Sequence, residues 1–477
     1  MAVATSASWQ VRPSTTGTPL ASPAAPSPAL GQSPSLPAEG CVPVVPSDQT
    51  SGEGIISIVM SSPGTDWSSD ANTSTVVDVH VDGGPSQQIV LFDGAEPFRY
   101  EGFLGTLTGQ PHCVTLTVRP DLSHDTTVTP KVLVYSVGLL LVPIDSPAYM
   151  VESHAPVLYG RSTSALGDSP LITYGQQSPD PDGSDTDLSY TVIWTHEDVG
   201  DGVVAAYEWG LWGRMTDIET VLNEKVDPNG KILSASYLSC GCEGVPVYPD
   251  IVPEDPAQGG ETDKPYPQNG ASPGLGNHLG IRDATGNNDI SPTGTTSFRF
   301  QQTLVTAPRA GETREAAMDT NSWTYRISND EISRETATSN DPDNFLAGQY
   351  PQYLIVDINS QPVGTGSVSI AVQLDNGTWY SNDYQQMTAP GPATGFPFYN
   401  GGHGRTVIKL PPGWHSAAIT GLRLTLNAAH PGTTPSLPSA PTIELLEVTD
   451  QYQVQTRSTP TPQILTGTQV IPEQLGH

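Results

Sequence analysis

Short runs of β-branched and other apolar residues, separated by turn signals, set the pattern of this chain from residue 54 onward. The first part contains five such runs, at residues 55–60, 75–81, 88–92, 113–118 and 131–142. The breaks between them hold Asp-Gly, Gly-Gly, Pro-Asp and Thr-Pro pairs, which favour turns. Strands this short and closely spaced are typical of β-sandwiches rather than of alternating strand–helix units. We therefore expect a small β-sandwich over residues 41–146, either jelly-roll or immunoglobulin-like.

The same pattern continues over a longer stretch, which we expect to form a large, mostly β domain over residues 147–455. The 47 glycines and 46 prolines argue against a mostly helical fold. One short helix is predicted near residues 312–335, where Trp323 and Ile327 stand four residues apart and fall on one helix face. The predicted fold class is therefore mostly β, with an N-terminal β-sandwich followed by a larger β-sandwich-type domain.

Three segments lack the alternating pattern. Residues 1–40 are rich in Pro, Ser and Ala and predict a disordered linker, because they hold too few apolar side chains to offset chain entropy. Residues 456–477 are polar and rich in Pro and Thr, and we expect a flexible tail there. Residues 243–297 contain many Pro, Gly, Asn and Asp and predict a long loop, which is either ordered and functional or disordered.

The charge balance limits the partners of this chain. It has 50 acidic and only 19 basic side chains, for a formal net charge of −31. Nucleic acids and anionic membrane surfaces bind clustered Lys and Arg, so we expect no nucleic-acid partner. No apolar stretch approaches the roughly 20 residues that span a bilayer, so we expect no membrane insertion.

The four cysteines bear on the compartment. A disulfide between Cys41 and Cys113 is plausible if the protein is exported, and the alternative is that these thiols are buried and free. Cys240 and Cys242 are too close in sequence for an easy mutual bridge.

Tryptophans, carboxylates and an arginine gather between residues 194 and 219. The candidate ligand-binding residues are Glu197, Trp209, Trp212 and Arg214, and the candidate catalytic pair is Asp217 and Glu219. Sugar sites use this mixture, because indole rings stack on sugar faces while carboxylates bind hydroxyls or act as acid and base. On a strand, Asp217 and Glu219 share a face with Cα atoms about 6.5–7 Å apart. The alternative is that the tryptophans belong to the core and the acids are solvated.

A second candidate group lies in residues 152–162. His154 is a candidate general base, because histidine titrates near neutral pH. Arg161 is a candidate ligand-binding residue, since a guanidinium can bind a carboxylate through two parallel hydrogen bonds. The alternative is an entry segment whose polar side chains satisfy the backbone.

Alternating carboxylates surround Gly183. The candidate metal ligands are Asp180, Asp182, Asp185 and Asp187. Hard cations take several oxygen ligands, so the run predicts calcium as the one expected cofactor, although its spacing is not that of an EF-hand. A solvated acidic hairpin is the alternative. A shorter acidic run lies at residues 283–289.

Four stretches together resemble a known family. They are HAPVLYGRS at 154–162, YTVIWTHEDVGDG at 190–202, WGRMTDIE at 212–219 and AMDTNSWTY at 317–325. Over about residues 147–450 the chain resembles an uncharacterised family of secreted bacterial β-rich proteins, many of them actinobacterial. The resemblance implies export and a single large β domain, and it implies no reaction and no catalytic residue.

These observations favour an extracellular, carbohydrate-associated protein. In the leading hypothesis, the Trp/carboxylate surface of the large domain recognises glycan or a cell-surface polysaccharide. In the first alternative, the protein is a secreted glycoside hydrolase-type enzyme in which Asp217 and Glu219 are acid and base and Arg214 orients the substrate. In the second, it is a structural or virion-type β protein, which would also be acidic and rich in Gly and Thr.

Overall fold

The computed structural model describes residues 41–46, 51–69, 73–124, 131–161, 168–180, 183–196, 213–239, 262–267, 272–285, 288–294, 296, 298–300, 303–306, 315–335, 348–360, 365–382, 403–428 and 432–470. Within these ranges the chain forms five β-sheets and three α-helices. The mostly β, multi-sheet fold that the sequence predicts is therefore confirmed. In the described part of the chain, no helix is both long enough and apolar enough to cross a membrane.

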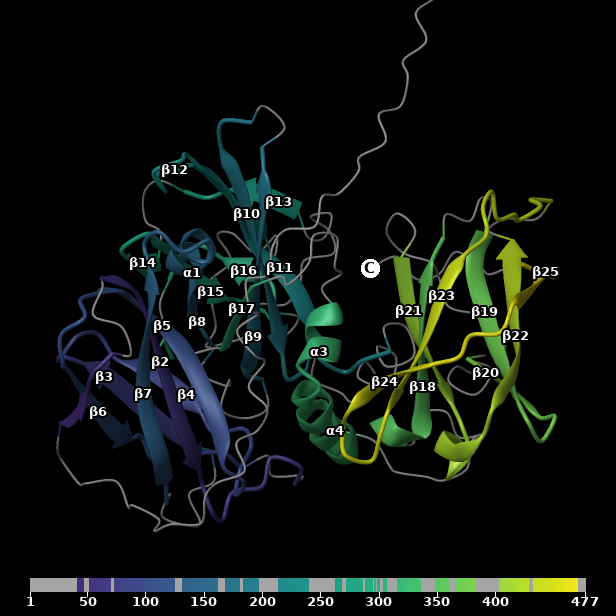
Figure 1. The fold of residues 1–477 in the computed structure, drawn as a ribbon, viewed down its shortest axis with the longest axis horizontal. Helices are drawn as coiled ribbons and strands as arrows, with labels where there is room; N and C mark the ends of the chain where they lie inside the picture. Colours follow the sequence, from purple (N-terminus) through teal and green to yellow (C-terminus); the bar gives the residue numbers. More distant parts are fainter. Residues whose placement is uncertain are drawn as a thin grey trace, which may run out of the picture.

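Seven strands near the N-terminus form two sheets that pack on one apolar core (Figure 1). The first sheet has the order β1-β6-β3-β4 and the second the order β5-β2-β7. The strands are β1 (Val42–Val44), β2 (Gly52–Ser61), β3 (Val76–Val81), β4 (Gln87–Val90), β5 (Phe98–Leu107), β6 (His112–Val118) and β7 (Leu133–Pro143). All pairs are antiparallel. Cys41, just before β1, forms a disulfide with Cys113 on β6, with Cα atoms 5.2 Å apart. We call this unit the N-terminal sandwich.

A larger sheet, which we call the central sheet, follows the short helix α1 (Tyr149–His154). Its main path is β14-β15-β16-β12-β11-β10-β9-β17, with β13 paired to β12 and β8 paired to β15. The strands are β8 (Val157–Tyr159), β9 (Pro170–Pro179), β10 (Thr186–Trp194), β11 (Ile218–Val226), β12 (Ile232–Ser239), β13 (Thr262–Pro265), β14 (Ser272–Leu275), β15 (His278–Asp283), β16 (Ile290–Ser291) and β17 (Thr303–Thr306).

Strands β13 to β16 lie within the predicted long loop at 243–297, so that prediction is wrong for the described part of the segment. These strands have only two to six residues, which is too short to show an alternating pattern. Several of their partners are distant in sequence: β15, for example, runs parallel to β8.

The last strands form a second sandwich with its own core, which we call the C-terminal sandwich. Its sheets have the orders β21-β18-β23-β24 and β20-β19-β22-β25. The elements are the 3₁₀ helices η3 (Tyr350–Gln352) and η4 (Trp414–Ser416) and the strands β18 (Tyr353–Asn359), β19 (Thr365–Leu374), β20 (Trp379–Ser381), β21 (His403–Lys409), β22 (Ile419–Ala428), β23 (Thr442–Val448), β24 (Val454–Arg457) and β25 (Pro462–Val470). The stretch predicted as one large domain at 147–455 thus holds two sheet systems.

The predicted flexible tail at 456–477 is corrected by β24 and β25. Strand β25 pairs in parallel with β22, from Leu422 opposite Pro462 to Ala428 opposite Val470. The composition is polar because this is an edge strand, whose side chains from residue 462 to 466 are exposed or half-buried. Residues 471–477 lie outside the described part, as do residues 1–40.

Two helices occupy the predicted helical region, and they lie between the β units (Figure 1). The prediction was a single helix, but α3 (Ala316–Thr320) ends at Asn321, whose ψ of 62° leaves the helical region, and α4 (Trp323–Glu335) then begins. On α4, Ile327 is fully buried, and the ring of Trp323 lies 4.8 Å from that of Phe98 in the N-terminal sandwich.

Paired charges strengthen these junctions. Arg326 on α4 binds both carboxylate oxygens of Asp93, next to β4. Arg405 on β21 binds Asp319 of α3 and Asp357 of β18, each through both carboxylate oxygens. The helices therefore join the N-terminal and C-terminal sandwiches through two-point ion pairs, which fix orientation as well as distance.

Candidate functional site

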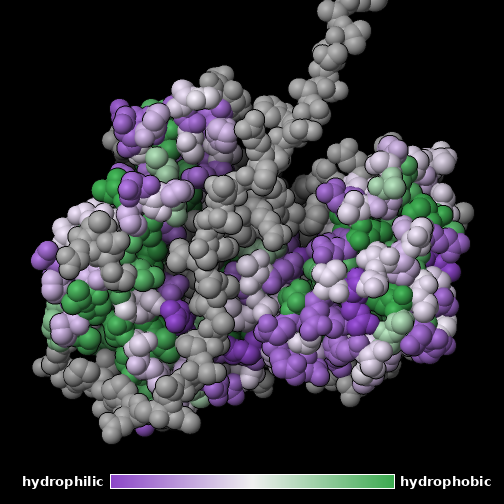
Figure 2. All heavy atoms as spheres, in the orientation of Figure 1, coloured by the Kyte–Doolittle hydropathy of each residue, from purple (hydrophilic) through white to green (hydrophobic). Residues whose placement is uncertain are grey.

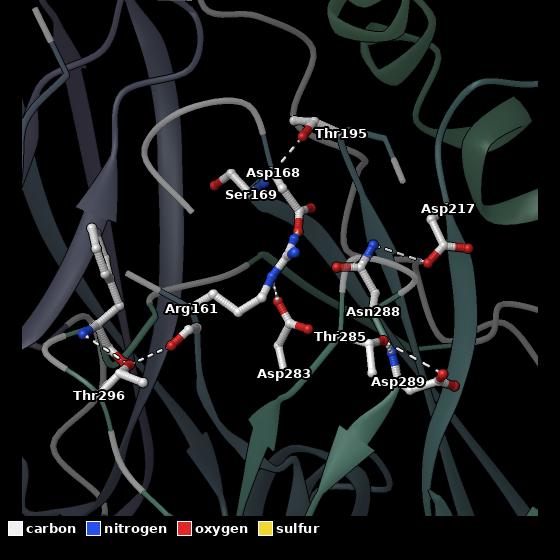
Figure 3. Close-up of polar contacts among 12 residues, drawn as sticks. Arg161, Asp168, Ser169, Thr195, Asp217, Asp283, Thr285, Asn288, Asp289 and Thr296 are labelled. Atoms are coloured by element: carbon white, nitrogen blue, oxygen red, sulfur yellow. Dashed lines mark hydrogen bonds and ion pairs between the residues drawn. The ribbon is translucent and has the colours of Figure 1, made fainter. Parts of the chain in front are cut away.

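Buried polar side chains gather at one end of the central sheet (Figure 3). Each of these residues stands where a strand begins or ends. Neighbouring strands there are mainly antiparallel, so the start of one strand lies beside the end of the next, at the same end of the sheet. The residues are Arg161 after β8, Asp168 and Ser169 before β9, Thr195 and His196 after β10, Asp217 before β11, Asp283 at the end of β15, and Asn288 and Asp289 before β16. We call this group the strand-end cluster.

Arg161 is the cation of the strand-end cluster. It is fully buried, its Nε donates to Asp283 Oδ2 at 3.0 Å, and its Nη2 donates to Asp168. Burial, opposed by Arg161, raises the pKa of Asp283 to about 6. The sequence proposed Arg161 as a carboxylate-binding residue, and the carboxylates that it binds belong to its own chain. Its role in the structure is to hold β8, β9 and β15 together.

Asn288 is the residue that links the remaining segments. Its Nδ2 donates to the main-chain oxygen of His196 at 3.2 Å and to Asp217 Oδ2 at 3.0 Å. Its φ of 56° lies in the left-handed region, which Asn tolerates better than most residues. The turn is fixed on both sides, because Asp289 N donates to Thr285 Oγ1 at 3.0 Å and Ala284 N to the Asp289 oxygen at 2.8 Å.

Glu219 lies on β11, and Asp217 immediately precedes that strand. Glu219 stands opposite Val192 of β10, and Trp194 N donates to the main-chain oxygen of Asp217 at 2.9 Å. That the two side chains share one face of the sheet stays a prediction. Asp217 is only 5% exposed, whereas Glu219 is half-buried. The carboxylate of Asp217 is thus held by Asn288 inside the cluster.

Arg214 lies beside this pair but points to the main chain. It is 4% exposed and donates from Nη1 to the main-chain oxygen of Thr216. The predicted ligand-binding residues Glu197, Trp209 and Trp212 fall in residues 197–212, outside the described part.

His154 does not join the strand-end cluster. It ends α1, is fully buried, and donates from Nδ1 to Glu224 Oε2 at 2.9 Å. Glu224 stands seven residues beyond Asp217, which is roughly 23 Å along the strand at the usual rise per residue. His154 therefore lies toward the opposite end of the central sheet from Asp217 and Glu219, and its role as a general base stays a prediction.

The acidic run around Gly183 forms the turn between β9 and β10. Asp180 N donates to the Asp185 oxygen at 3.0 Å, and Lys225 Nζ donates to Asp180 Oδ2 at 2.6 Å. The hydrogen bond to Asp180, helped by the charges of Asp187 and Asp185, raises the pKa of Lys225. Among the described residues, no three or more His, Cys, Asp or Glu side chains are grouped as a metal site. Asp182 lies outside that part, and calcium at this turn stays a prediction.

Comparison with known proteins assigns no identity. No family model matches this sequence, and no curated protein matches it.

Several buried polar residues of this site were not predicted from the sequence. Asn288 lies in a Gly-Asn-Asn-Asp stretch that reads only as a turn signal. Asp283 and Asp289 were noted as a short acidic run, but Arg161, the partner of Asp283, is 122 residues away in the sequence. Only the fold could bring these residues together.

Proposed function

We propose that this protein is an extracellular glycan-binding protein, and that its binding surface is carried by residues 197–212 together with Asp217 and Glu219. The observation that carries the proposal is the position of Asn288. One side chain binds both His196 and Asp217, so it ties together the two ends of the segment that contains Glu197, Trp209 and Trp212.

This arrangement suits ligand recognition, because binding residues are commonly placed on connecting segments held by a rigid scaffold. Here the scaffold is the strand-end cluster, in which Arg161 is neutralised by Asp168 and Asp283. Tryptophan supplies a flat apolar face for a sugar ring, and a carboxylate such as Glu219 supplies a hydrogen-bond acceptor for its hydroxyl groups.

The extracellular location draws on two observations. The disulfide between Cys41 and Cys113 is of a kind that persists in oxidising compartments and is rare in the cytosol. The resemblance to secreted bacterial β-rich proteins points the same way.

The test is a glycan array and a hydrolysis screen with the full chain. We expect binding to a glycan, and Trp212→Ala should weaken it by about 1–3 kcal/mol, since an aromatic ring removes a large apolar area from water. The matched control is Trp379→Ala in the C-terminal sandwich, where the half-buried indole lies 4.1 Å from the Arg423 guanidinium. This control should bind as the unaltered protein does.

The same screen separates the alternatives. If Glu219→Gln or Asp217→Asn abolishes glycan hydrolysis while binding persists, the protein is an enzyme, because losing an acid or base costs on the order of 10²–10⁴ in rate. If the folded protein neither binds nor cleaves any glycan, the proposal fails and a structural role is favoured.

A further inference from the structure

A second group of buried titratable residues lies between the N-terminal sandwich and the central sheet. It consists of Glu53 on β2, Glu152 and His154 on α1, Glu224 on β11 and His278 on β15. Each of these residues is at most 5% exposed. We call this group the junction cluster. It holds three carboxyl groups and two imidazoles with no Lys or Arg among them. The hydrogens available for hydrogen bonds between these side chains are therefore those on the carboxyl and imidazole groups themselves.

His278 on β15 lies beside Glu53 on β2. His278 Nδ1 lies 2.6 Å from the main-chain oxygen of Ala155, and since a carbonyl only accepts, Nδ1 carries a hydrogen. Its other nitrogen, Nε2, lies 3.3 Å from Glu53 Oε1. That oxygen already accepts a hydrogen bond from Gly105 N at 2.7 Å. His278 and Glu53 therefore lie against each other across the junction.

The N-terminal sandwich also contacts the flat face of the His278 ring. Its ring stacks on Phe103 of β5, with centroids 4.3 Å apart and planes 11° from parallel. His278 therefore contacts two residues of the N-terminal sandwich, Glu53 and Phe103, across the junction.

Glu152 is the member of the cluster that needs a proton. Its Oε2 is buried without a hydrogen-bond partner, and the charged groups that act on it are the carboxylates of Glu53 and Glu101, of which Glu101 pairs with Arg99 at 3.7 Å. Burial, the largest cause, and these two carboxylates raise the pKa of Glu152 from 4.5 to about 8. An ionised Glu152 would be a buried negative charge among negative neighbours, which is strongly unfavourable.

The remaining pair completes the cluster. His154 Nδ1 donates to Glu224 Oε2, while His154 Nε2 and Glu224 Oε1 are buried without partners. His154 lies just under the turn from β11 to β12, because a Cβ added to Gly230 would lie 3.5 Å from His154 Nε2. Burial raises the pKa of Glu224, and His154 opposes this. The titratable and charged groups that face Glu152 and its partners are Glu53, Arg99, Glu101, His154, Tyr190, Glu224, Tyr266 and His278.

We propose that the junction cluster is a pH-dependent switch, which holds the N-terminal sandwich on the central sheet while Glu152 is protonated and loosens this junction when Glu152 loses its proton. The surfaces it joins are closely packed. Tyr190 Oη donates to the Val151 oxygen at 2.9 Å, and a Cβ added to Gly175 would come within 2.4 Å of Val151 Cγ1. Helix α1 therefore lies directly on β9 and β10, and it carries Glu152 and His154 into the junction.

The direction of the pH dependence follows from proton linkage. Glu152 keeps its proton in the closed junction up to about pH 8, whereas a solvated glutamic acid loses it near pH 4.5. Its stabilising contribution is complete below about pH 4.5 and is lost as the pH rises toward 8. Because opening releases one proton, the opening equilibrium should increase by a factor approaching ten for each pH unit in this window.

The test is hydrogen–deuterium exchange of the full chain from pH 6 to pH 8, corrected for the intrinsic pH dependence of amide exchange. We expect amides of β2 and β15 to open more frequently as the pH rises, by nearly tenfold per unit, while those of β21 in the C-terminal sandwich do not. Glu152→Gln, which keeps the shape and removes the titration, should reduce this slope sharply. Glu444→Gln, at an exposed glutamate on β23, should leave it unchanged.

A flat slope in the unaltered protein, or an undiminished slope in Glu152→Gln, would overturn the proposal. If Glu152→Gln does not fold, Glu152→Leu provides the second measurement, because it removes the titrating carboxyl group without burying an amide. That variant should also show a smaller slope than the unaltered protein, and an equal slope would again overturn the proposal.

Discussion

Asn288 combines a left-handed backbone with a fully buried amide, and both features follow from its place in the strand-end cluster. Residues other than glycine rarely adopt this conformation unless the surrounding contacts determine it. Here the contacts are hydrogen bonds to His196 and Asp217. The amide donor also satisfies a buried carboxylate, which would otherwise be costly.

Replacing Asn288 with glycine tests whether the side-chain amide of Asn288 holds Asp217 in place. Glycine adopts the same φ without strain, so Asn288→Gly removes mainly the amide. We expect the free energy of unfolding to fall by about 1–3 kcal/mol, the usual cost of leaving a buried polar group unsatisfied. Urea denaturation followed by intrinsic fluorescence measures this. An unchanged unfolding midpoint would mean that Asn288 does not hold Asp217 in solution.

Some of this site was predictable from the sequence and some was not. The shared face of Asp217 and Glu219 is what the two-residue period of a strand predicts, but β11 begins at Ile218 and so includes Glu219 and not Asp217. The partners of Arg161 were not predictable, because Asp283 is distant in sequence and is brought close only by the parallel pairing of β8 with β15. His154 was singled out for its chemistry, yet its partner Glu224 depends on helix α1 packing against the sheet, and no local pattern shows that.

At the scale of elements, the hairpin formed by β9 and β10 carries the predicted calcium ligands. Lys225 on the adjacent strand β11 already neutralises Asp180. Carboxylates that repel one another in the absence of an ion should be stabilised by calcium through binding linkage.

We therefore expect millimolar calcium to raise the melting temperature relative to EDTA, and Lys225→Gln to enlarge this shift because it removes the competing cation. Lys231→Gln, at an exposed lysine beyond the next turn, is the control. Superimposable melting curves with calcium and with EDTA, in both the unaltered protein and Lys225→Gln, would show that the hairpin is simply a solvated acidic turn.

Elements were predictable where β-branched and other apolar residues recur over at least about six residues, as in β2, β10 and β18. They were missed where strands are very short, as in β16, or polar and at a sheet edge, as in β25. Strand β18 is buried on both faces, because Leu354 and Val356 enter the core of the C-terminal sandwich while Tyr353 and Ile355 enter the other core. This explains its continuous apolar run.

At the scale of the whole molecule, α4 connects units that are far apart in sequence. One apolar core runs from the N-terminal sandwich through the central sheet to α4 and the outer face of β18, whereas the C-terminal sandwich encloses a separate core. Figure 2 shows hydrophobic residues interspersed with hydrophilic ones over both sandwiches on the face seen there. The large exposed apolar side chains among the described residues are Val45, Leu140, Ile144, Leu233 and Ile464.

Breaking the ion pair between Arg326 and Asp93 tests how much the contact of α4 with the N-terminal sandwich contributes to stability. Breaking a fully buried pair costs roughly 3–5 kcal/mol, and since the Arg326 side chain is 33% exposed we expect Arg326→Gln to cost less than this. Asp93, whose pKa burial raises against the opposing effect of Arg326, would then lie in the junction without its cation.

Scanning calorimetry should show the N-terminal sandwich unfolding at a lower temperature than in the unaltered protein. The double variant Arg326→Gln, Asp93→Asn should recover part of the loss, because it also removes the unpaired charge. A double variant no more stable than Arg326→Gln alone would contradict this account of the pair.

The disulfide between Cys41 and Cys113 has a mechanical consequence. The two cysteines are 72 residues apart, and strands β1 to β5 lie between them. A pulling force that enters from the N-terminal side reaches Cys41 first and passes through the covalent bond directly to β6. The enclosed residues, which would extend by about 240–260 Å as a free chain, are shielded from the tension. Under load in an oxidising medium, that part of the N-terminal sandwich behaves as an inextensible link.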